Sequence, residues 1–129
     1  MRLLLDTHVL IWAMVDPRRL PKPLAAALRS PDNDVAVSAT TVWEIAIKKR
    51  LGNLDLDLEE LLGVIAEEGF SELPVRFSHA VHVNELPPIH RDPFDRILIA
   101  QSIVEGRRLV TTDREILKYI VPGFNPLTA

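Results

Sequence analysis

The sequence predicts an α/β fold in which helices cover both faces of a central parallel sheet. Short apolar runs suited to buried strands alternate along the chain with longer segments of helical periodicity, an order typical of parallel sheets. The chain of 129 residues shows no repeat, linker or low-complexity tract. We therefore expect a single domain over residues 1–129, large enough to bury a core.

Proline, glycine and aspartate delimit the predicted elements in the first half of the chain. Pro17 breaks a short helix, and Gly52 stands just past the end of a long one. Asp57 can cap the helix that follows, and Gly69 ends it. We expect strands at residues 2–5 and 35–37, and helices at 7–15, 24–29, 39–51 and 58–69.

The second half begins with a short strand and a weak helix, which the Pro-Pro pair at 87–88 ends. Asp92 and Pro93 suit the cap and the first position of the next helix, which ends at Gly106. A further strand follows, and Asp113 then opens a last short helix. We expect strands at residues 73–75 and 108–111, and helices at 78–85, 93–106 and 114–120.

The composition excludes several kinds of site and location. The chain has no cysteine, which rules out disulfides, thiolate metal sites and cysteine nucleophiles and suits a reducing cytoplasm. His79 and His82 lie three residues apart, but His8 and His90 have no metal-ligand pattern around them. No stretch is apolar enough to span a membrane, and the N-terminal apolar run is interrupted too early for a signal peptide. We expect a cytoplasmic protein without a membrane segment.

Four acidic residues stand where ligands gather in folds of this class. Asp6 directly follows the first predicted strand and Asp113 follows the last, while Glu44 and Asp95 lie on predicted helices. In a parallel sheet, ligands bind outside the carboxyl ends of the strands. If the sheet forms as predicted, the four carboxylates lie at the same edge.

Asp95 gives the strongest indication, because it opens a helix that is apolar around most of its circumference. At about 100° per residue, only Asp95 and Ser102 share a narrow polar strip, and Gln101 is about 100° away. An ionised carboxylate left dry at a helix end costs several kcal/mol unless it has a partner. Arg96 also projects about 100° away, so a divalent cation shared with other acids is the better partner.

Each acid also has a plain structural alternative. Asp6 and Asp113 could simply cap the helices that follow them, and Asp95 could be a first-turn acid stabilised by the helix dipole. Glu44 could pair with Lys48, four residues later, on the helix surface. The strip that Glu44 and Lys48 share could face either water or a polar cleft.

A cluster of carboxylates is chemically suited to a divalent cation. Carboxylates at close range repel one another, so either their pKa values rise or a metal ion offsets the charge. Carboxylates and water are the ligands of Mg²⁺ and Mn²⁺, and such an ion can bridge a phosphate and activate a water. The sequence has no glycine-rich phosphate loop, no G-x-S-x-G turn and no dinucleotide fingerprint. With a net charge of −3, the chain would need either a cation from elsewhere or a local basic patch to meet a phosphate. Metal-assisted phosphodiester hydrolysis is the chemistry to which these observations point.

Four segments of the chain are LLLDTHVLIW (3–12), SATTVWEIAIKKRLG (38–52), HRDPFDRILIAQ (90–101) and LVTTD (109–113). Together they resemble the PIN-domain nucleases, and more narrowly the VapC-type toxins of bacterial and archaeal toxin–antitoxin pairs. They occur in the family's order and at similar spacing, over nearly the whole chain. The resemblance implies a three-layer α/β/α PIN-like fold with a central parallel sheet, and an endoribonuclease that uses Mg²⁺ or Mn²⁺.

The resemblance assigns the family's four acids, as metal ligands and catalytic residues, to Asp6, Glu44, Asp95 and Asp113. Asp92 is a second acid near the third of these positions. The stretch DRILIAQ aligns better when it begins at Asp95, so Asp92 keeps its capping role and could support the site from outside the ligand set.

Other residues could support such a site. The family's small hydroxyl before the last acid falls on Thr111, whose neighbour Thr112 could be confused with it, and Thr7 follows the first acid as in many relatives. Two assignments are our own extrapolation from charge. Lys48 could reach into the cleft, and the basic patch at 49–50 could guide RNA.

The resemblance also implies partners. VapC-type toxins are typically homodimers, and a small antitoxin inhibits them by pushing a basic side chain towards the acidic site. A cluster of carboxylates is a natural target for an arginine, so the charges agree. We therefore expect an RNA substrate, a cognate antitoxin and a homodimer. The sequence leaves open the identity of the RNA and its cleavage sequence, the number of metal ions, the antitoxin and the dimer interface.

Three other functions are alternatives. A non-catalytic PIN-fold binding scaffold would have an acid missing or out of place, and none is missing. A phosphoacceptor receiver domain would carry paired acids after the first strand, where Asp6 stands alone before Thr7. A DNA nuclease could use the same metal site, but the sequence shows no accessory DNA-gripping element.

Overall fold

The computed structural model describes residues 1–128 and contains a four-stranded, entirely parallel sheet. The strands are β1 (Arg2–Leu5), β2 (Asp34–Ser38), β3 (Ser71–Leu73) and β4 (Arg108–Val110). Their spatial order is β3-β2-β1-β4. The chain first extends the sheet to one side of β1 and then returns to its other side. The direction of winding therefore reverses between β1 and β4, which is where open α/β sheets bind ligands.

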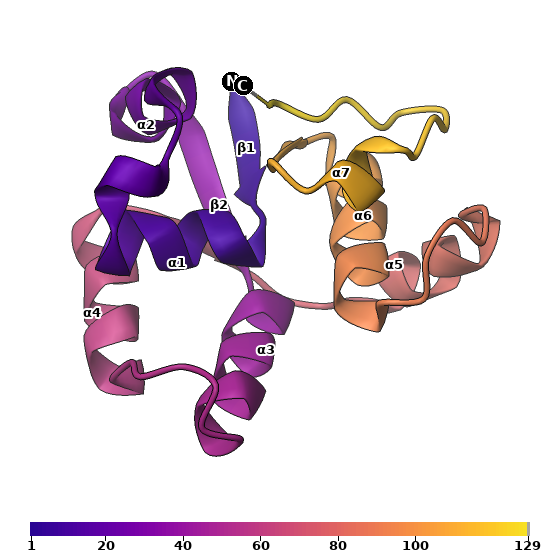
Figure 1. Cartoon of the computed structure of the whole chain (residues 1–129). Coiled ribbons are helices and arrows are strands. Elements are labelled where there is room, and N and C mark those ends of the chain that lie inside the picture. Colours follow the sequence, from indigo (N-terminus) through magenta and orange to yellow (C-terminus); the bar gives the residue numbers. More distant parts are fainter. Residues whose placement is uncertain (129) are drawn as a thin grey trace.

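Helices surround this sheet on three sides (Figure 1). In Figure 1, α1, α2 and α4 lie on one side of the sheet and α5, α6 and α7 on the other, while α3 lies below the carboxyl ends of the strands. The three-layer α/β/α prediction is confirmed. The helices are α1 (Thr7–Val15), α2 (Lys22–Arg29), α3 (Ala39–Arg50), α4 (Leu58–Glu67), α5 (Phe77–His82), α6 (Pro93–Glu105) and α7 (Arg114–Leu117), with short 3₁₀ turns η1 (Pro17–Arg19) and η2 (Val83–Glu85).

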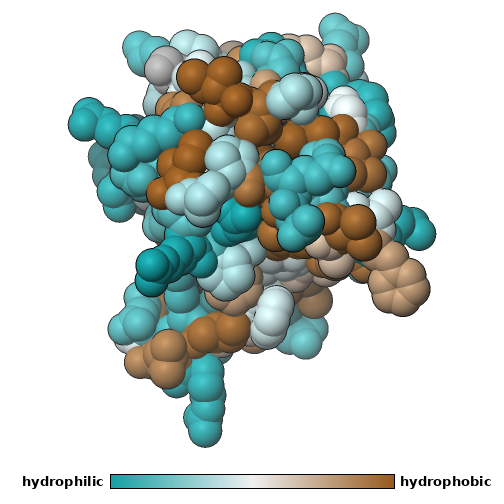
Figure 2. All heavy atoms as spheres, turned by 90° about the vertical axis from the view of Figure 1, so that its right-hand side faces the viewer, coloured by the Kyte–Doolittle hydropathy of each residue, from teal (hydrophilic) through white to brown (hydrophobic). Residues whose placement is uncertain are grey.

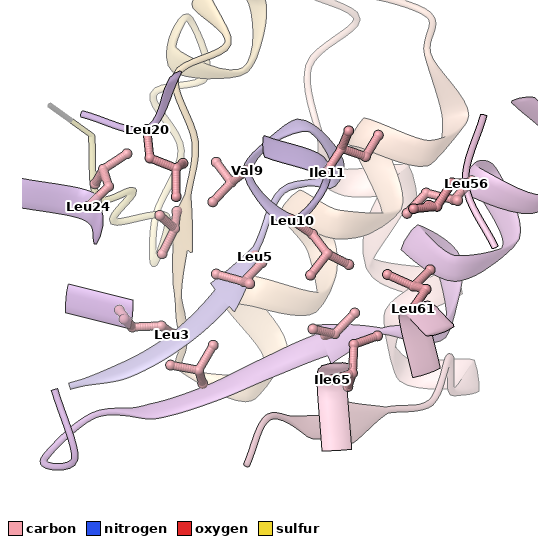
Figure 3. Close-up of a cluster of buried hydrophobic side chains, with 14 residues drawn as sticks. Leu3, Leu5, Val9, Leu10, Ile11, Leu20, Leu24, Leu56, Leu61 and Ile65 are labelled. Atoms are coloured by element: carbon pink, nitrogen blue, oxygen red, sulfur yellow. The ribbon is translucent and has the colours of Figure 1, made fainter. Parts of the chain in front are cut away.

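The sheet divides the core into two hydrophobic clusters, because alternate strand residues point to opposite faces. Leu3 and Leu5 of β1 belong to the cluster under α1, α2 and α4, whereas Leu4 belongs to the cluster under α6 and α7. Figure 3 shows the first cluster, in which Leu10 and Leu61 pack towards the strands. Both faces of the sheet are therefore covered by apolar side chains along β1, and polar residues lie at the ends of β2 and on the edge strand β3.

Capping side chains fix where several helices begin. Five helices have an N-cap residue whose side chain accepts a hydrogen bond from a backbone N–H of the first turn. These caps are Asp6 for α1, Ser38 for α3, Asp57 for α4, Asp92 for α6 and Asp113 for α7. α6 ends at Gly106, whose φ of 64° lies in the left-handed region that favours glycine. The predicted capping roles of Asp57 and Asp92 are confirmed.

Some predicted boundaries were wrong. β3 spans Ser71–Leu73 rather than residues 73–75, because Pro74 has no N–H to donate and so ends the pairing with β2. α7 ends at Leu117 rather than residue 120. Lys118 and Tyr119 donate their N–H groups to carbonyls three residues back, at Glu115 and Ile116, so the α-helical pattern stops there.

Two smaller differences lie elsewhere in the second half. The helix predicted at 78–85 is α5 followed by the 3₁₀ turn η2, and the strand predicted at 108–111 ends at Val110. Thr111 instead donates its N–H to the carbonyl of Leu127, where the chain end runs beside β4. No helix within residues 1–128 is long and apolar enough to cross a membrane.

Candidate active site

The carboxyl ends of β1 and β4 place two of the predicted acids on adjacent loops. Asp6 directly follows β1, Asp113 lies three residues beyond β4, and the two strands are neighbours. The buried hydroxyl of Thr111 donates to Asp6 Oδ2 at 2.8 Å and accepts from the N–H of Asp113 at 3.0 Å. Thr111 thus ties both acidic loops to one point, beside the position where the winding of the sheet reverses.

Helix α3 brings Glu44 to the same edge. The Thr7 hydroxyl donates to Glu44 Oε1 at 2.7 Å, and Lys48 Nζ lies 3.2 Å from Glu44 Oε2. Glu44 is only 7% exposed, whereas a residue on the solvent face of a helix would be open. Glu44 therefore does not face open water: its carboxylate is buried against Thr7, and it also forms the predicted pair with Lys48.

Asp95 lies in the first turn of α6 with its side chain 13% exposed. The nearest basic group is the ring of His90, whose Nε2 lies 3.6 Å from Asp95 Oδ2. Arg96 points elsewhere, as predicted. Its guanidinium donates to the Tyr119 hydroxyl and to carbonyls of η2 and of the loop that follows it. Asp95 is thus nearly buried, and within residues 1–128 no cationic side chain is hydrogen-bonded to it.

The electrostatics of Asp95 reflect the negative charges around it. Burial raises the pKa of Asp95, and the negative charges of Asp6, Asp92, Asp113 and Glu44 raise it further, to about 8. Each of these carboxylates must lie close enough for its charge to act on Asp95. Burial also raises the pKa of Asp6, to which the charge of Asp113 adds.

The capping alternatives also hold, and they leave the acids free for other roles. Asp6 Oδ1 accepts from the N–H of Thr7, and Asp113 Oδ1 accepts from the N–H groups of Glu115 and Ile116. Each cap uses a single carboxylate oxygen, Oδ1. Capping and cation binding are therefore compatible in the same residue.

The residues fit a hard divalent cation by their chemistry. All four candidate ligands present carboxylate oxygens, the donors that Mg²⁺ and Mn²⁺ prefer. The raised pKa of Asp95 is the sign of a negative cluster that a cation would relieve. Within residues 1–128, however, no three His, Asp or Glu side chains stand close enough together to hold an ion as they are. A bound cation would have to draw the carboxylates closer.

Sequence reasoning missed His90, because no second ligand stands near it at a metal-binding spacing. In the structure it is the residue that faces Asp95. The signal that could have found it is its position two residues before Asp92, in a loop that must fold back to cap α6.

An apolar hollow of about 500 Å³ is lined in part by residues that neighbour two of the acids in the sequence. Trp43 precedes Glu44 and Phe94 precedes Asp95, and the two aromatic rings meet edge to face with their centroids 5.1 Å apart. Val75, at the end of the loop after β3, also lines this hollow. The site therefore combines an acidic edge with an exposed apolar neighbour.

Comparison with known proteins gives one family. A family model described as the PIN domain matches residues 3–120. The chain is 32% identical over 122 residues to Ribonuclease VapC22 of Mycobacterium tuberculosis, and the match covers 92% of each protein.

Solved structures share the fold at lower identity. A chain in the crystal structure of VapBC2 from Rickettsia felis, bound to a DNA fragment from their promoter, has a TM-score of 0.76 at 15% identity and covers 100% of this chain and 99% of that chain. A chain of VapBC-5 from Mycobacterium tuberculosis, a member of the VapBC family of toxin-antitoxin systems, has a TM-score of 0.58 at 21% identity, with 90% and 88% covered. These likenesses extend over most of the chain and show the same fold.

Proposed function

The chain belongs to the PIN domain family, and on that premise we propose that it is an endoribonuclease that acts as the toxin of a toxin–antitoxin pair. The observation that carries the proposal is the convergence of acids on Asp95, whose pKa rises to about 8 because of burial and four negative neighbours. A fold needs no such cluster, since it destabilises the protein until a cation binds. We further propose that residues 1–129 form one nuclease domain.

We assign the metal-binding and catalytic roles to Asp6, Glu44, Asp95 and Asp113. A Mg²⁺ or Mn²⁺ ion held by these carboxylates would supply positive charge to the scissile phosphate and lower the pKa of an attacking water. The protein's own contribution is to keep the carboxylates oriented and largely dry, which strengthens every charge interaction in the site.

Supporting residues hold the carboxylates in place. The Thr111 hydroxyl orients Asp6, and the Thr7 hydroxyl orients Glu44 from the opposite side to Lys48. Lys48 also pairs with Glu44 Oε2 and so offsets part of the negative charge of that carboxylate. In this proposal Asp92 acts indirectly, through the cap of α6 that places Asp95.

The substrate and partners follow from the charge of the site. An RNA backbone would approach along the exposed basic residues Lys49 and Arg50, at the end of the helix that carries Glu44. A cognate antitoxin would block the same site with a basic side chain directed at the carboxylates. The proposal places the protein in the cytoplasm, where its RNA substrate would be found.

The proposal includes a homodimer. Large apolar side chains are exposed: Trp43 and Val75 line the apolar hollow, and Phe77 and Val81 lie on α5. Figure 2 looks onto the side of the molecule that carries α5, and it shows apolar patches separated by hydrophilic side chains. Exposed apolar patches of this kind support association with a second copy.

The proposal is tested by incubating purified protein with total RNA in Mg²⁺ and in EDTA. We expect the wild type to cleave RNA only in Mg²⁺ or Mn²⁺, and Asp6→Asn to lose activity by about a hundredfold or more. Asparagine still caps a helix, so α1 should survive the change. Asp57→Asn is the matched control, since it makes the same change at the cap of α4, away from the acids.

Circular dichroism should report the same helical content for all three proteins. A folded wild type that leaves RNA intact in both Mg²⁺ and Mn²⁺ would favour the non-catalytic scaffold. Full activity of Asp6→Asn would remove Asp6 from the site.

A further inference from the structure

The ring of His90 is fixed in place beside Asp95. It packs edge to face against Tyr119, with ring centroids 5.5 Å apart and an interplanar angle of 82°. Tyr119 is buried, and its hydroxyl accepts a hydrogen bond from Arg96 at 3.0 Å. The backbone N–H of His90 also donates to that hydroxyl, at 3.5 Å. The imidazole therefore has a rigid wall behind it and Asp95 in front of it.

The hydrogen bonds of His90 define which ring nitrogen carries the proton. Nδ1 accepts from the N–H of Asp92 at 3.3 Å. In a neutral imidazole one nitrogen accepts and the other donates, so this contact places the proton on Nε2. Nε2 is the atom that faces Asp95 Oδ2.

Nε2 of His90 is a buried donor that lacks a hydrogen-bond partner within residues 1–128. Such groups are rare in folded proteins, and each one calls for an explanation. The 3.6 Å separation from Asp95 Oδ2 is slightly too long for a hydrogen bond. Contacts of this kind often tighten when a site is loaded, and a shortening to about 3.0 Å would complete the bond.

From this geometry we propose that His90 is a positioning residue that holds the Asp95 carboxylate for a divalent cation, an inference that rests on the proposed metal-dependent function. The Nε2–H group of His90 donates a hydrogen bond to Asp95 Oδ2, which leaves Asp95 Oδ1 available to the cation. Partners that hydrogen-bond a ligating carboxylate from behind fix its orientation and tune the metal.

The same short loop also fixes the backbone of Asp95. Asp92 Oδ1 accepts from the N–H groups of Phe94 and Asp95, while the Asp92 N–H holds the His90 ring. Asp92 and His90 thus act as a pair. Asp92 sets where α6 begins, and His90 sets the orientation of the Asp95 carboxylate.

The test measures Mn²⁺ binding to the RNA-free protein by electron paramagnetic resonance, so that it does not depend on cleavage. His90→Phe keeps an aromatic ring against Tyr119 but removes the donor, whereas His90→Gln keeps an N–H group near the position of Nε2. We expect His90→Phe to weaken Mn²⁺ binding about tenfold to a hundredfold, and His90→Gln to stay within about threefold of the wild type. His82→Phe, on the half-buried ring that pairs with Glu85, should bind as the wild type does.

A second measurement uses the wild type alone, in case a variant fails to fold. The ¹⁵N shifts of the His90 ring should identify the tautomer with its proton on Nε2. A proton on Nδ1 would overturn the proposal. A folded His90→Phe variant that binds Mn²⁺ as tightly as the wild type would also overturn it. So would a His90→Gln variant that binds Mn²⁺ as weakly as His90→Phe, because that result would indicate that the packing of the ring matters rather than its N–H donor.

The result also separates this proposal from the function on which it rests. If the wild type itself binds no Mn²⁺, the metal-dependent function fails and His90 loses its role with it. If the wild type binds Mn²⁺ and cleaves RNA while His90→Phe is unchanged, only the positioning role is refuted.

Discussion

Asp95 carries most of the electrostatic cost of the site. Burial withdraws its carboxyl group from water, and four neighbouring carboxylates oppose its ionisation, so its pKa rises to about 8. At neutral pH, without a cation, the folded protein therefore favours the protonated form. A cation would reverse that preference, because metal ligands must be deprotonated.

Replacing Asp95 with asparagine should stabilise the metal-free protein at high pH. The unfolded chain releases this proton at about pH 4. The folded chain keeps it until about pH 8, because its pKa is raised. As the pH rises from about 4 to about 8, the native state therefore loses stability relative to the unfolded chain, whereas below about pH 4 both states hold the proton and this loss is absent. We expect Asp95→Asn to gain about 1–2 kcal/mol at pH 8, after allowance for partial exposure, and little at pH 4.

The measurement is the free energy of unfolding in urea at the two pH values. Millimolar Mg²⁺ is the companion experiment. It should stabilise the wild type at pH 8 and stabilise Asp95→Asn much less, because the variant lacks a ligand. Equal gains for Asp95→Asn at both pH values would show that its carboxyl is not perturbed.

The Thr111 hydroxyl gives a second prediction at this scale. Thr111→Val keeps the shape of the side chain but removes the hydrogen bonds to Asp6 Oδ2 and from the Asp113 N–H. We expect a loss of about 1–3 kcal/mol of stability, because buried polar groups are left unpaired. Loss of cleavage activity should accompany it. Thr112→Val is the matched control, and an equal effect of the two changes in urea unfolding would contradict the assignment.

At the scale of elements, α6 is the helix that determines the site. Its N-terminus carries Asp95, and its buried face carries Leu98, Ile99 and Ala100 into the core. The helix cannot shift along its axis without opening that core, so its cap fixes the height of Asp95 above the sheet.

Removing this cap should destabilise the protein. We expect Asp92→Ala to cost about 1 kcal/mol, because the N–H groups of Phe94 and Asp95 lose their acceptor. Asp92→Asn should restore most of that stability, since asparagine also caps helices. Urea unfolding of both variants tests this, and equal losses would mean that the charge of Asp92, rather than its cap, supports α6.

Elements were predictable where the signal was local. The long helices α3 and α6 have a cap at the start and a glycine just beyond the end, and both form within a residue of the predicted bounds. β3 and α7 were placed wrongly because apolar residues were read as part of an element that had already ended. Pro74 ends β3 before Val75, which is 46% exposed, and Ile120 lies beyond α7 and is 93% exposed.

At the scale of the whole molecule, the strand order places the acids. β1 is central, with β2 on one side and β4 on the other, so the loops after β1 and β4 meet at one edge. α3 then crosses beneath that edge and packs against both α1 and α6. The fold thus gathers groups from four separate segments of the chain.

The exposed apolar surface gives a prediction at this scale. Phe77 and Val81 on α5 are 92% and 71% exposed, and Trp43 and Val75 are exposed as well. We expect the wild type to be a dimer by light scattering and Phe77→Asp to be a monomer, because a buried unpaired charge opposes association. Leu62→Asp makes the same kind of change at a half-exposed residue of α4, on the opposite side of the sheet, and should remain dimeric. A monomeric wild type would refute the homodimer.

The sequence by itself determined the α/β class, most of the elements and the candidate acids. Periodicity, caps and breakers act within a few residues, and the resemblance of four segments supplied their grouping. The tertiary structure decided that Glu44 is buried against Thr7, that Thr111 joins Asp6 to the loop of Asp113, and that His90 stands beside Asp95. The burial of a carboxylate and the identity of its neighbours depend on segments far apart in the chain. Only the packed sheet and helices fix those distances.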